Sequence, residues 1–573
     1  MKNLTRILAF LLCVVFVVMA FASCGKKKKK DDATTAQPQT TGSVTPVSTE
    51  RDWASIADDI AGFAASNRRF KVELDVLTNA ERISKNKEYL EGPDKVTEGE
   101  TALIEQYVYE RNHNAMEDLG IEGIEYTYWD YGWNQQNPQI VTAVQGNAAD
   151  APDLFVNMVF DLNLALKTQG VFRDIQTFPG GYFDFDSKGW MKSWMESLSF
   201  TGDRAYILGS DYFLDILRAM GVLPFNMYLM DQNSTKLATA ILDASDPLGA
   251  DEQLSTRFFD FVEQGKWTYD ALHNLCEAIW EDSDGSGNNS IQDVLGIVTD
   301  KYSGMPAALM LYSSGVHTHE TTQLEDGRQW ISLPESSEAL GSIFDAVAGV
   351  FSGQGAFVTN DSTSKGATAD TPGIPYHYIK FAENTLLFAG PALLSALEGA
   401  AFQGMEQLYS VVPLPKVNLT DDYNTIIHNT SDAGAINVNT NPQRARTISA
   451  YLQHVTEHST EIRDEFLQIV MKYKNTTYDQ GTDRMLDLIY DKVTNARDKA
   501  MEDTAESKGE LRFHAKMKDH AFTWTSAEIS SDYLANRDTK NAHINSVMNK
   551  WYNDLPQGTA TYTPENTEST PEG

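Results

Sequence analysis

The sequence predicts an α/β fold built around a parallel sheet, because segments typical of strands alternate along the chain with segments typical of helices. Residues 70–77 alternate polar with apolar side chains, and strand patterns return at 124–128 and 153–157. Helical periodicity fills the two intervals, over 101–119 and 138–145. Strands joined by helices in this order form a parallel sheet with crossover helices. The outer helices are expected at 53–69 and 162–169.

The side chains that follow the carboxyl ends of these strands are candidates for ligand binding. In open α/β sheets, ligands bind beyond those ends. Asn79 follows the first strand, residues 129–133 (WDYGW) follow the second, and Asn157 ends the third. The candidates from this argument are Asn79, Trp129, Asp130, Tyr131, Trp133 and Asn157.

Three aromatic rings surround a glycine in residues 129–133, and this loop has two interpretations. The rings could be core packing at the end of the sheet. They could instead be platforms for the apolar faces of sugars, with the Asp130 carboxylate accepting hydrogen bonds from hydroxyl groups. In the second interpretation Trp133 is the stronger candidate, because Trp129 continues the strand and belongs more readily to the core.

The first 24 residues have the pattern of a secretory signal. Lys2 and Arg6 form a basic start, an apolar run covers 7–22, and Cys24 follows. The pattern resembles a bacterial lipoprotein signal, whose cysteine receives the lipids, although Phe21 stands where an aliphatic residue is usual. The alternative is a transmembrane anchor, but the run is shorter than the ~20 residues that span a bilayer comfortably. We therefore expect a lipid anchor at Cys24 on the extracytoplasmic face of the cell membrane.

Two polar segments flank the expected globular part. Residues 31–50 are mostly Asp, Thr, Gln, Ser, Pro and Gly and cannot bury enough apolar surface to fold, so they predict a flexible tether. Five lysines at 26–30 precede it, either lying against an anionic membrane surface or serving only as a positive flank. Residues 557–573 are similarly polar and predict a disordered tail.

Charge and cysteine content narrow the class of protein. The formal net charge is -34, which argues against nucleic acid as a partner because phosphate binding needs a basic surface. Cys13 lies in the signal and Cys24 is the expected lipidation site, so Cys276 has no cysteine to pair with. An exported protein without disulfides depends on its core, and 573 residues are enough for two or more domains.

Residues 282–293 (DSDGSGNNSIQD) have the spacing of a calcium-binding loop. Oxygen-bearing side chains stand at positions 1, 3, 5, 7, 9 and 12, and Gly287 stands at position 6, as in an EF-hand loop. Position 12 is Asp rather than a bidentate Glu, and no helix pair is evident. A structural calcium site and a plain acidic turn are therefore both open interpretations. The ligands in the first are Asp282, Asp284, Ser286, Asn288, Ser290 and Asp293.

Histidine motifs give only weak indications of metal chemistry. His454, Glu457 and His458 match the H-x-x-E-H pattern of certain zinc peptidases, but so short a pattern arises by chance, and a solvated helix face is the favoured interpretation. His317 and His319 could similarly hold an adventitious metal ion. No G-x-S-x-G, P-loop or G-x-G-x-x-G motif occurs, so no catalytic residue and no catalytic cofactor is expected.

Several short motifs stand in a characteristic order along most of the chain. They are YERN at 109–112, GIEY at 123–126, DAPD at 150–153, GVFRDI at 170–175, GDRAY at 202–206, FNMY at 225–228, WTYD at 267–270, NTLLFAGP at 384–391, VVPLPK at 411–416 and SDAGAIN at 431–437. No single motif is diagnostic, but their order resembles a family 1 extracellular solute-binding protein. These are the receptor lipoproteins of bacterial ABC importers, here of the carbohydrate type.

The resemblance implies a two-lobed periplasmic-binding-protein-like α/β fold with crossing hinge strands and a ligand between the lobes. By analogy the chain crosses near 215–230 and near 425–435, so that Tyr212 and Asp432 would face the strand-end candidates. The implied divisions are the signal at 1–23, the lipidated cysteine and tether at 24–52, the first lobe at 53–220, the second lobe at 221–428, the return to the first lobe at 429–485, the helical end of the second lobe at 486–556 and the tail at 557–573.

The expected function is that of a non-enzymatic receptor. It would capture a small-molecule ligand, an oligosaccharide in the first interpretation, and deliver it to the permease of an ABC transporter. Hinge closure would follow from ligand contacts with both lobes. A surface-anchored hydrolase of glycans or peptides is the alternative from another class, and a peptide receptor of the same fold is a third interpretation.

Overall fold

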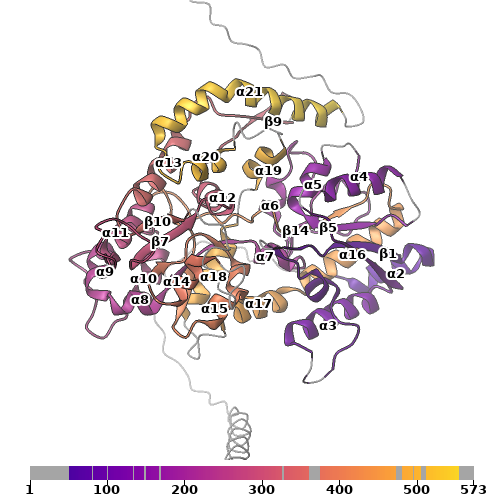
Figure 1. The fold of residues 1–573 in the computed structure, drawn as a ribbon. Helices are drawn as coiled ribbons and strands as arrows, with labels where there is room; N and C mark the ends of the chain where they lie inside the picture. Colours follow the sequence, from indigo (N-terminus) through magenta and orange to yellow (C-terminus); the bar gives the residue numbers. More distant parts are fainter. Residues whose placement is uncertain are drawn as a thin grey trace, which may run out of the picture. The chain divides into compact units, whose positions relative to one another are not determined.

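Two separate β-sheets organise the chain, and each is covered by helices (Figure 1). The predicted α/β class is thereby confirmed. The computed structural model describes residues 51–79, 82–97, 99, 101–132, 135–146, 150–166, 170–325, 328–359, 375–472, 480–493, 496–504 and 512–553. The predicted signal, Cys24, the tether up to residue 50 and the tail lie outside these residues.

The first sheet has the strand order β14-β5-β1-β4. Its strands are β1 Arg69–Asp75, β4 Gly123–Trp129, β5 Leu154–Met158 and β14 Asp432–Ile436. β1 pairs in parallel with β4 and β5, whereas β14 runs antiparallel to β5. The three parallel strands are those that the sequence predicts at 70–77, 124–128 and 153–157, with slightly shifted bounds. Their carboxyl ends therefore meet at one edge of the sheet.

The helices of the first sheet follow the predicted order, with one early ending. They are α2 Trp53–Ala61, α3 Leu103–Asp118, α4 Gln136–Gly146, α5 Val159–Leu166, α6 Lys192–Ser197, α16 Pro442–Glu457 and α17 Thr460–Lys472. The helix predicted over 53–69 stops at Ala61, because the chain needs Arg69 for the start of β1. Between them lie the short elements η1 Ala65–Asn67, β2 Thr78–Asn79, β3 Arg82–Ile83 and η2 Lys87–Glu91.

The second sheet has the order β10-β7-β11-β6-β12, and β13 also pairs with β6. Its strands are β6 Gly221–Asn226, β7 Leu295–Asp300, β10 Ala356–Thr359, β11 Leu386–Phe388, β12 Ala392–Leu393 and β13 Tyr409–Val412. β7 is parallel to β10 and β11, and β6 is antiparallel to its partners. The carboxyl ends of β7, β10 and β11 therefore also share one edge.

Helices and one hairpin complete the part of the chain around the second sheet. They are α7 Leu214–Arg218, α8 Met227–Gln232, α9 Ser234–Ile241, α10 Leu254–Glu263, α11 Tyr269–Ile279, α12 Met305–Tyr312, β8 Glu320–Gln323, β9 Gln329–Ser332, α13 Glu338–Phe351, α14 Tyr376–Ala382, η3 Leu394–Glu398, α15 Ala400–Gly404, α18 Gln480–Asp491, α19 Arg497–Thr504, α20 Phe513–Asp519 and α21 Ser526–Asn553. The last four of these helices lie within residues 480–553, and the resemblance implies a helical end of the second lobe at 486–556.

Short backbone pairings connect the chain segments that run between the two sheets. Gly221 N donates to Ile426 O at 2.9 Å, and Met220 forms an antiparallel bridge with Ile427. Thr425 N donates to Lys492 O at 2.8 Å. The first two crossings lie within the ranges that the resemblance predicts.

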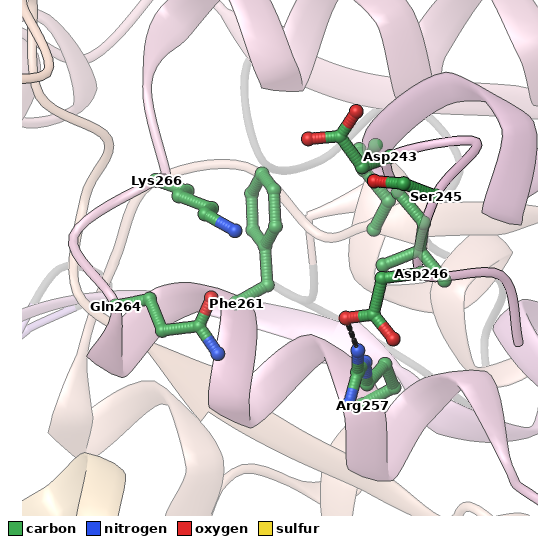
Figure 2. Close-up of a pocket in the computed structure, with 9 residues that line it drawn as sticks. Asp243, Ser245, Asp246, Arg257, Phe261, Gln264 and Lys266 are labelled. Atoms are coloured by element: carbon green, nitrogen blue, oxygen red, sulfur yellow. Dashed lines mark hydrogen bonds and ion pairs between the residues drawn. The ribbon is translucent and has the colours of Figure 1, made fainter.

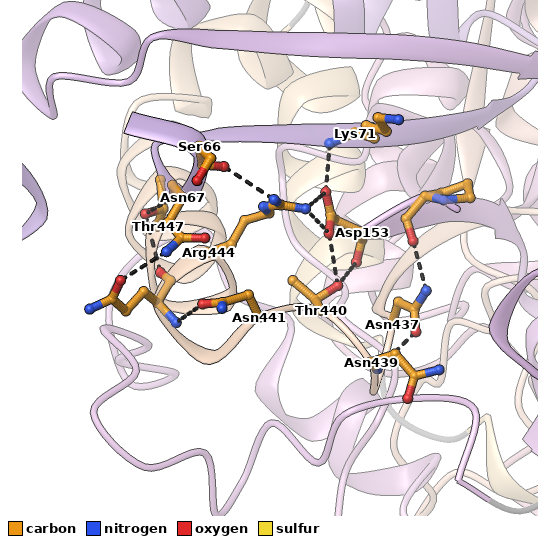
Figure 3. Close-up of polar contacts among 12 residues, drawn as sticks. Ser66, Asn67, Lys71, Asp153, Asn437, Asn439, Thr440, Asn441, Arg444 and Thr447 are labelled. Atoms are coloured by element: carbon orange, nitrogen blue, oxygen red, sulfur yellow. Dashed lines mark hydrogen bonds and ion pairs between the residues drawn. The ribbon is translucent and has the colours of Figure 1, made fainter. Parts of the chain in front are cut away.

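A buried carboxylate, Asp153, fixes the connection from β14 to α16 (Figure 3). It accepts hydrogen bonds from Lys71 N at 2.9 Å and from Thr440 Oγ1 at 3.1 Å. It also pairs with Arg444 Nη1 at 3.1 Å. These contacts hold the amino end of β5, so they fix in place the strand whose other end carries Asn157.

Two further properties concern the fold as a whole. Residues 52–573 form one compact unit, so the predicted lobe boundaries at 220, 428 and 485 stay predictions. Within the described ranges, none of the helices combines the length and the hydropathy that a membrane span needs.

Candidate functional site

Seven buried polar side chains gather at the carboxyl ends of β1 and β5 and at the start of β14, and we call them the strand-end cluster. None of them is more than 2% exposed. The cluster consists of Glu73, Asp75, Asn86, Gln136, Asn157, Asp161 and Asp432. It contains two of the residues that the sequence nominates for ligand binding, Asn157 and Asp432.

Two asparagines, Asn157 and Asn86, connect the cluster members other than Asp161, which accepts hydrogen bonds from Asn137 at 3.0 Å. Asn157 Nδ2 donates to both carboxyl oxygens of Glu73 at 3.2 Å and to Gln136 Oε1 at 2.7 Å. Asn86 Nδ2 donates to Asp75 O at 2.7 Å and to Asp432 Oδ2 at 2.6 Å. Since Glu73 and Asp75 are two residues apart on β1, their side chains leave the same face of the strand. The two hydrogen-bonded groups therefore meet at this strand.

The electrostatics of the strand-end cluster favour a neutral Glu73. Burial raises the pKa of its carboxyl well above the ordinary 4.5, and the nearby carboxylates of Asp75, Asp432 and Asp161 raise it further. The hydrogen bond from Asn157 acts in the opposite direction and is outweighed. A protonated Glu73 can donate a hydrogen bond, which an ionised carboxylate cannot do.

An aromatic rim follows the carboxyl end of β4. Trp129 is half-buried, and its ring lies 5.9 Å from that of Phe155 in the core. Tyr131 meets Trp129 edge-on at 5.8 Å and is 38% exposed, and Asp130 is exposed. Trp129 thus packs partly in the core, whereas Tyr131 and Asp130 face solvent. Trp133 lies outside the described residues, as does the side chain of Asn79 at the end of β2.

Tyr212 occupies a different environment from the strand-end cluster. It is 1% exposed, and the guanidinium of Arg111 lies 4.6 Å from the centre of its ring. Its ring also meets that of Tyr451 edge-on at 6.0 Å. Tyr212, Asn157 and Asp432 are all buried in this structure, so a ligand could touch them only after they become exposed.

The carboxyl end of β7 supplies an exposed aromatic ring from the second sheet. Asp300 ends the strand and accepts hydrogen bonds from Tyr302 N at 2.9 Å and Ser303 N at 2.8 Å, which turns the chain sharply. Tyr302 is 60% exposed at this turn. Thr299, one residue before Asp300, is buried, and its hydroxyl has no partner among the described residues. This strand end therefore presents both a ring and polar groups.

Helix α19 carries a second buried polar group, although its sequence is highly charged. Asp498, Lys499, Glu502 and Asp503 are all at most 6% exposed. Lys499 Nζ pairs with both carboxyl oxygens of Asp503, at 2.6 and 2.7 Å. Asp503 in turn accepts a hydrogen bond from the side chain of Asn429. We call these four residues, with Asn429 and the residues His428, Tyr312 and His514 described next, the α19 cluster.

Burial keeps several members of the α19 cluster neutral. Glu502 accepts a hydrogen bond from Tyr312, and His514 Nδ1 lies 3.0 Å from Glu502 Oε2. Burial raises the pKa of Glu502 well above its ordinary value and lowers that of His514 well below its own. Burial, with Lys499 and His514 nearby, lowers the pKa of His428 to about 3. The cluster therefore offers neutral donors and acceptors beside one ion pair.

Backbone contacts join the strand ends and the α19 cluster into one polar region. Val159 N donates to Ser431 O at 2.8 Å and Phe160 N donates to Asn429 O at 3.0 Å, next to Asp432 of β14. On the other side, a Cβ on Gly304 would lie 3.4 Å from the ring of His514. Gly304 follows the turn that carries Tyr302. The α19 cluster thus touches segments that leave the carboxyl ends of both sheets.

The histidine motifs do not form metal sites in the structure. His454 Nε2 lies 3.1 Å from Asp118 Oδ2, and His458 Nδ1 lies 2.8 Å from the backbone oxygen of His454. Glu457 accepts a hydrogen bond from Gln453. Across the residues that the structure describes, the group with metal-binding spacing is the acidic loop alone.

His317 and His319 both contact the carboxylate of Asp498. Their Nδ1 atoms lie 3.2 and 3.4 Å from its oxygens. Burial acts to raise the pKa of Asp498, but hydrogen bonds from the two histidines lower it to about 2. The pair therefore anchors the start of α19.

The acidic loop at 282–293 brings three carboxylates together. One oxygen each of Asp282, Asp284 and Asp293 lie within 4.8 Å of one another. Backbone amides already orient them, since Gly287 N donates to Asp282 at 2.8 Å and Ser290 N donates to Asp293 at 2.8 Å. The donor set is all oxygen, which suits a hard cation such as calcium.

The pocket in Figure 2 does not belong to the polar region. It lies between the end of α9 and helix α10, and Asp246 pairs there with Arg257. Its volume is about 100 Å³. Ligand pockets for drug-sized molecules measure ~300–1,000 Å³, so this one is too small for an oligosaccharide.

Comparison with solved structures shows that the fold of this chain is similar to those of several sugar receptors. The GacH receptor of Streptomyces glaucescens, solved unliganded and with acarbose, is 10% identical with a TM-score of 0.44, and the match covers 83% of this chain and 98% of that chain. A family 1 extracellular solute-binding protein from Bifidobacterium longum subsp. infantis is 11% identical with a TM-score of 0.43, covering 83% and 98%.

A third solved structure is the ABC transporter-associated binding protein from B. animalis subsp. lactis Bl-04 in complex with β-1,6-galactobiose. It is 11% identical with a TM-score of 0.45, and the match covers 83% of this chain and 98% of that chain. No protein-family model matches the sequence, and no curated protein does. Similarity at this level does not identify a ligand.

Sequence reasoning missed Tyr302 and the α19 cluster. A signal for Tyr302 was present, because Gly296 and Ile297 indicate a strand and D-K-Y-S begins three residues after Ile297. Nothing comparable marked α19, since a helix reading RDKAMEDT is typical of a solvent-exposed surface.

The neutral state of Glu73 makes a prediction about pH. A carboxyl whose folded pKa lies above its unfolded value destabilises the fold as pH rises from about 4.5 through the folded pKa. Glu73→Gln cannot ionise. The melting temperature of the variant minus that of the parent should therefore increase as pH rises from 5 to 8. Thermal unfolding followed by circular dichroism measures this difference.

The matched control is Glu125→Gln, which alters an exposed carboxylate on β4. Its difference from the parent should be small and should not depend on pH. A Glu73→Gln difference that stays constant from pH 5 to 8 would mean that Glu73 is ionised in the folded protein.

Proposed function

We propose that the chain is a non-enzymatic, extracytoplasmic solute receptor that binds an oligosaccharide between its two sheets and delivers it to an ABC importer. One observation carries the proposal. The segments that follow β5 of the first sheet and β7 of the second sheet both reach the α19 cluster, because Phe160 N donates to Asn429 O at 3.0 Å and Gly304 lies against the ring of His514. Ligands of open α/β sheets bind at such ends. Backbone pairings between the crossing segments would serve as the hinge.

An oligosaccharide suits the side chains at the two strand ends. Tyr131 after β4 and Tyr302 after β7 expose aromatic faces, and Asp130 lies next to Tyr131. Sugars present apolar C–H faces to rings and hydroxyl edges to carboxylates and amides. The buried carboxyl and amide groups of the strand-end cluster would meet hydroxyl groups as the protein closes on its ligand. Acarbose and β-1,6-galactobiose, bound by two of the similar receptors, belong to the same chemical class.

The test begins with a thermal-shift screen of the protein against oligosaccharides and peptides, because a ligand that binds the folded state raises the melting temperature. With the best oligosaccharide, Tyr302→Ala should weaken binding about tenfold or more, since a stacked ring contributes ~1–3 kcal/mol. Tyr131→Ala should have a similar effect. Isothermal titration calorimetry measures both affinities.

Tyr228→Ala is the matched control, because Tyr228 is 39% exposed but lies on α8, away from either strand end. Its affinity should equal that of the parent. If neither Tyr302→Ala nor Tyr131→Ala changes the affinity, the two rings do not belong to the binding site. If only peptides raise the melting temperature, the ligand is a peptide and not an oligosaccharide.

We also propose that Cys24 carries the lipid anchor that the signal pattern predicts. Metabolic labelling with a fatty acid should mark the full-length protein, and membrane fractions should contain it. Cys24→Ser should lose the label and either leave the membrane or stay unprocessed. A variant that labels and fractionates like the parent would refute the anchor.

A structural calcium site in the acidic loop is a further part of the proposal. The convergence of Asp282, Asp284 and Asp293 supports it, with Ser286, Asn288 and Ser290 as the remaining oxygen donors. Adding calcium to chelator-treated protein should raise the melting temperature, and Asp284→Ala should abolish that response. Asp251→Ala, at an exposed aspartate outside the loop, is the control. If neither chelator nor calcium changes the melting temperature of the parent protein, the loop is only an acidic turn.

A further inference from the structure

Helix α21 is fixed along most of its length to elements of the second sheet. Ser526 N donates to Asp345 Oδ1 of α13 at 2.7 Å, and Tyr533 OH donates to Pro334 O at 2.5 Å. Farther along, Asn541 Oδ1 accepts a hydrogen bond from Leu333 N at 2.8 Å. Figure 1 shows the yellow helix running alongside α13 and β9.

The hairpin β8–β9 is attached to the same helix. Trp330 Nε1 donates to Asn545 Oδ1 at 3.0 Å, and the ring of Trp330 stacks on that of Tyr552 at 6.0 Å. The guanidinium of Arg328 lies 4.5 Å from the centre of the Tyr552 ring. The hairpin and the helix therefore form one rigid piece.

The last turn of α21 reaches elements of the first sheet. Trp551 Nε1 donates to Leu166 O at 3.1 Å, at the end of α5, the helix that directly follows β5. The Trp551 ring stacks on Phe200 with centres 4.3 Å apart and an angle of 22° between the planes. Phe200 lies between α6 and Leu208, which bridges to Gly434 of β14. Trp551 is 8% exposed, so the contact is closely packed.

We propose that α21 is a strap across the hinge and that Trp551 is the latch that holds the two sheets in the arrangement seen here. The proposal rests on the hinge motion of the proposed function. A helix of 28 residues is roughly 42 Å long and stiff, so rotation about the crossing segments moves its far end most. A rotation that moves α21 away from α5 must therefore separate Trp551 from Leu166.

The latch biases the ligand-free protein toward the arrangement seen here. In this arrangement the indole ring and its N–H are removed from water, and breaking the contact exposes both. Loss of the latch should increase the population of molecules in other arrangements.

The test measures the distance between elements of the two sheets in the protein without any ligand. Spin labels are attached to the full-length protein in detergent at cysteines replacing exposed Glu125 on β4 and exposed Lys236 on α9. Pulsed electron–electron double resonance then gives the distance distribution. Trp551→Ala should add or enlarge a second distance population. Trp551→Phe, which keeps a ring but loses the N–H donor, should give a smaller change.

Tyr533→Phe is the control, because it removes one hydrogen bond from the half of α21 that is attached to elements of the second sheet. It should leave the distribution unchanged. The strap is refuted if Trp551→Ala and Trp551→Phe both keep the parent distribution, or if Tyr533→Phe changes it as much as Trp551→Ala. If Trp551→Ala fails to fold by circular dichroism, Trp551→Phe decides alone. A failed ligand screen would count against the proposed receptor and leave this result standing.

Discussion

A few backbone hydrogen bonds between crossing segments are the constraint on which the rest of the structure depends. Gly221 N to Ile426 O at 2.9 Å and His428 N to Ala219 O at 2.9 Å hold two crossings side by side, and Thr425 N to Lys492 O at 2.8 Å adds the next. This pairing fixes where residues 428–431 lie before β14 begins. It thereby brings the ends of the first sheet next to α19.

The buried charges in this region are costly, and their arrangement explains how the protein tolerates them. An isolated buried ion would destabilise the fold by several kcal/mol. Lys499 and Asp503 offset this cost by pairing at 2.6 Å, and Glu502 and His514 avoid it because burial shifts both pKa values toward the neutral form. Apolar packing would be simpler if stability were the sole requirement. Hydrogen-bonding groups kept away from bulk water are what selective binding of a polar ligand needs.

The sequence allowed prediction of the elements whose periodicity reflects burial. α3 buries one face, so helical spacing locates it closely, whereas β5 is buried at all five residues and is marked by its apolar run. The same reasoning fails at α19, because the local sequence predicts that Lys499 and Glu502 are exposed to solvent. Both are buried, through contacts with residues outside the helix. Likewise Asn157 and Asp432 were placed at the correct strand ends. Their burial depends on Glu73 and Asn86, which no local pattern connects to them.

The central claim is that the chain binds a solute and returns it unchanged. Isothermal titration calorimetry of the full-length protein with the oligosaccharide that gives the largest thermal shift tests it most directly, when the ligand is afterwards recovered and analysed by mass spectrometry. The account predicts saturable binding of about one ligand per protein, and recovery of the intact ligand after prolonged incubation. Cleaved ligand in amounts exceeding the protein present would contradict the account and identify a hydrolase.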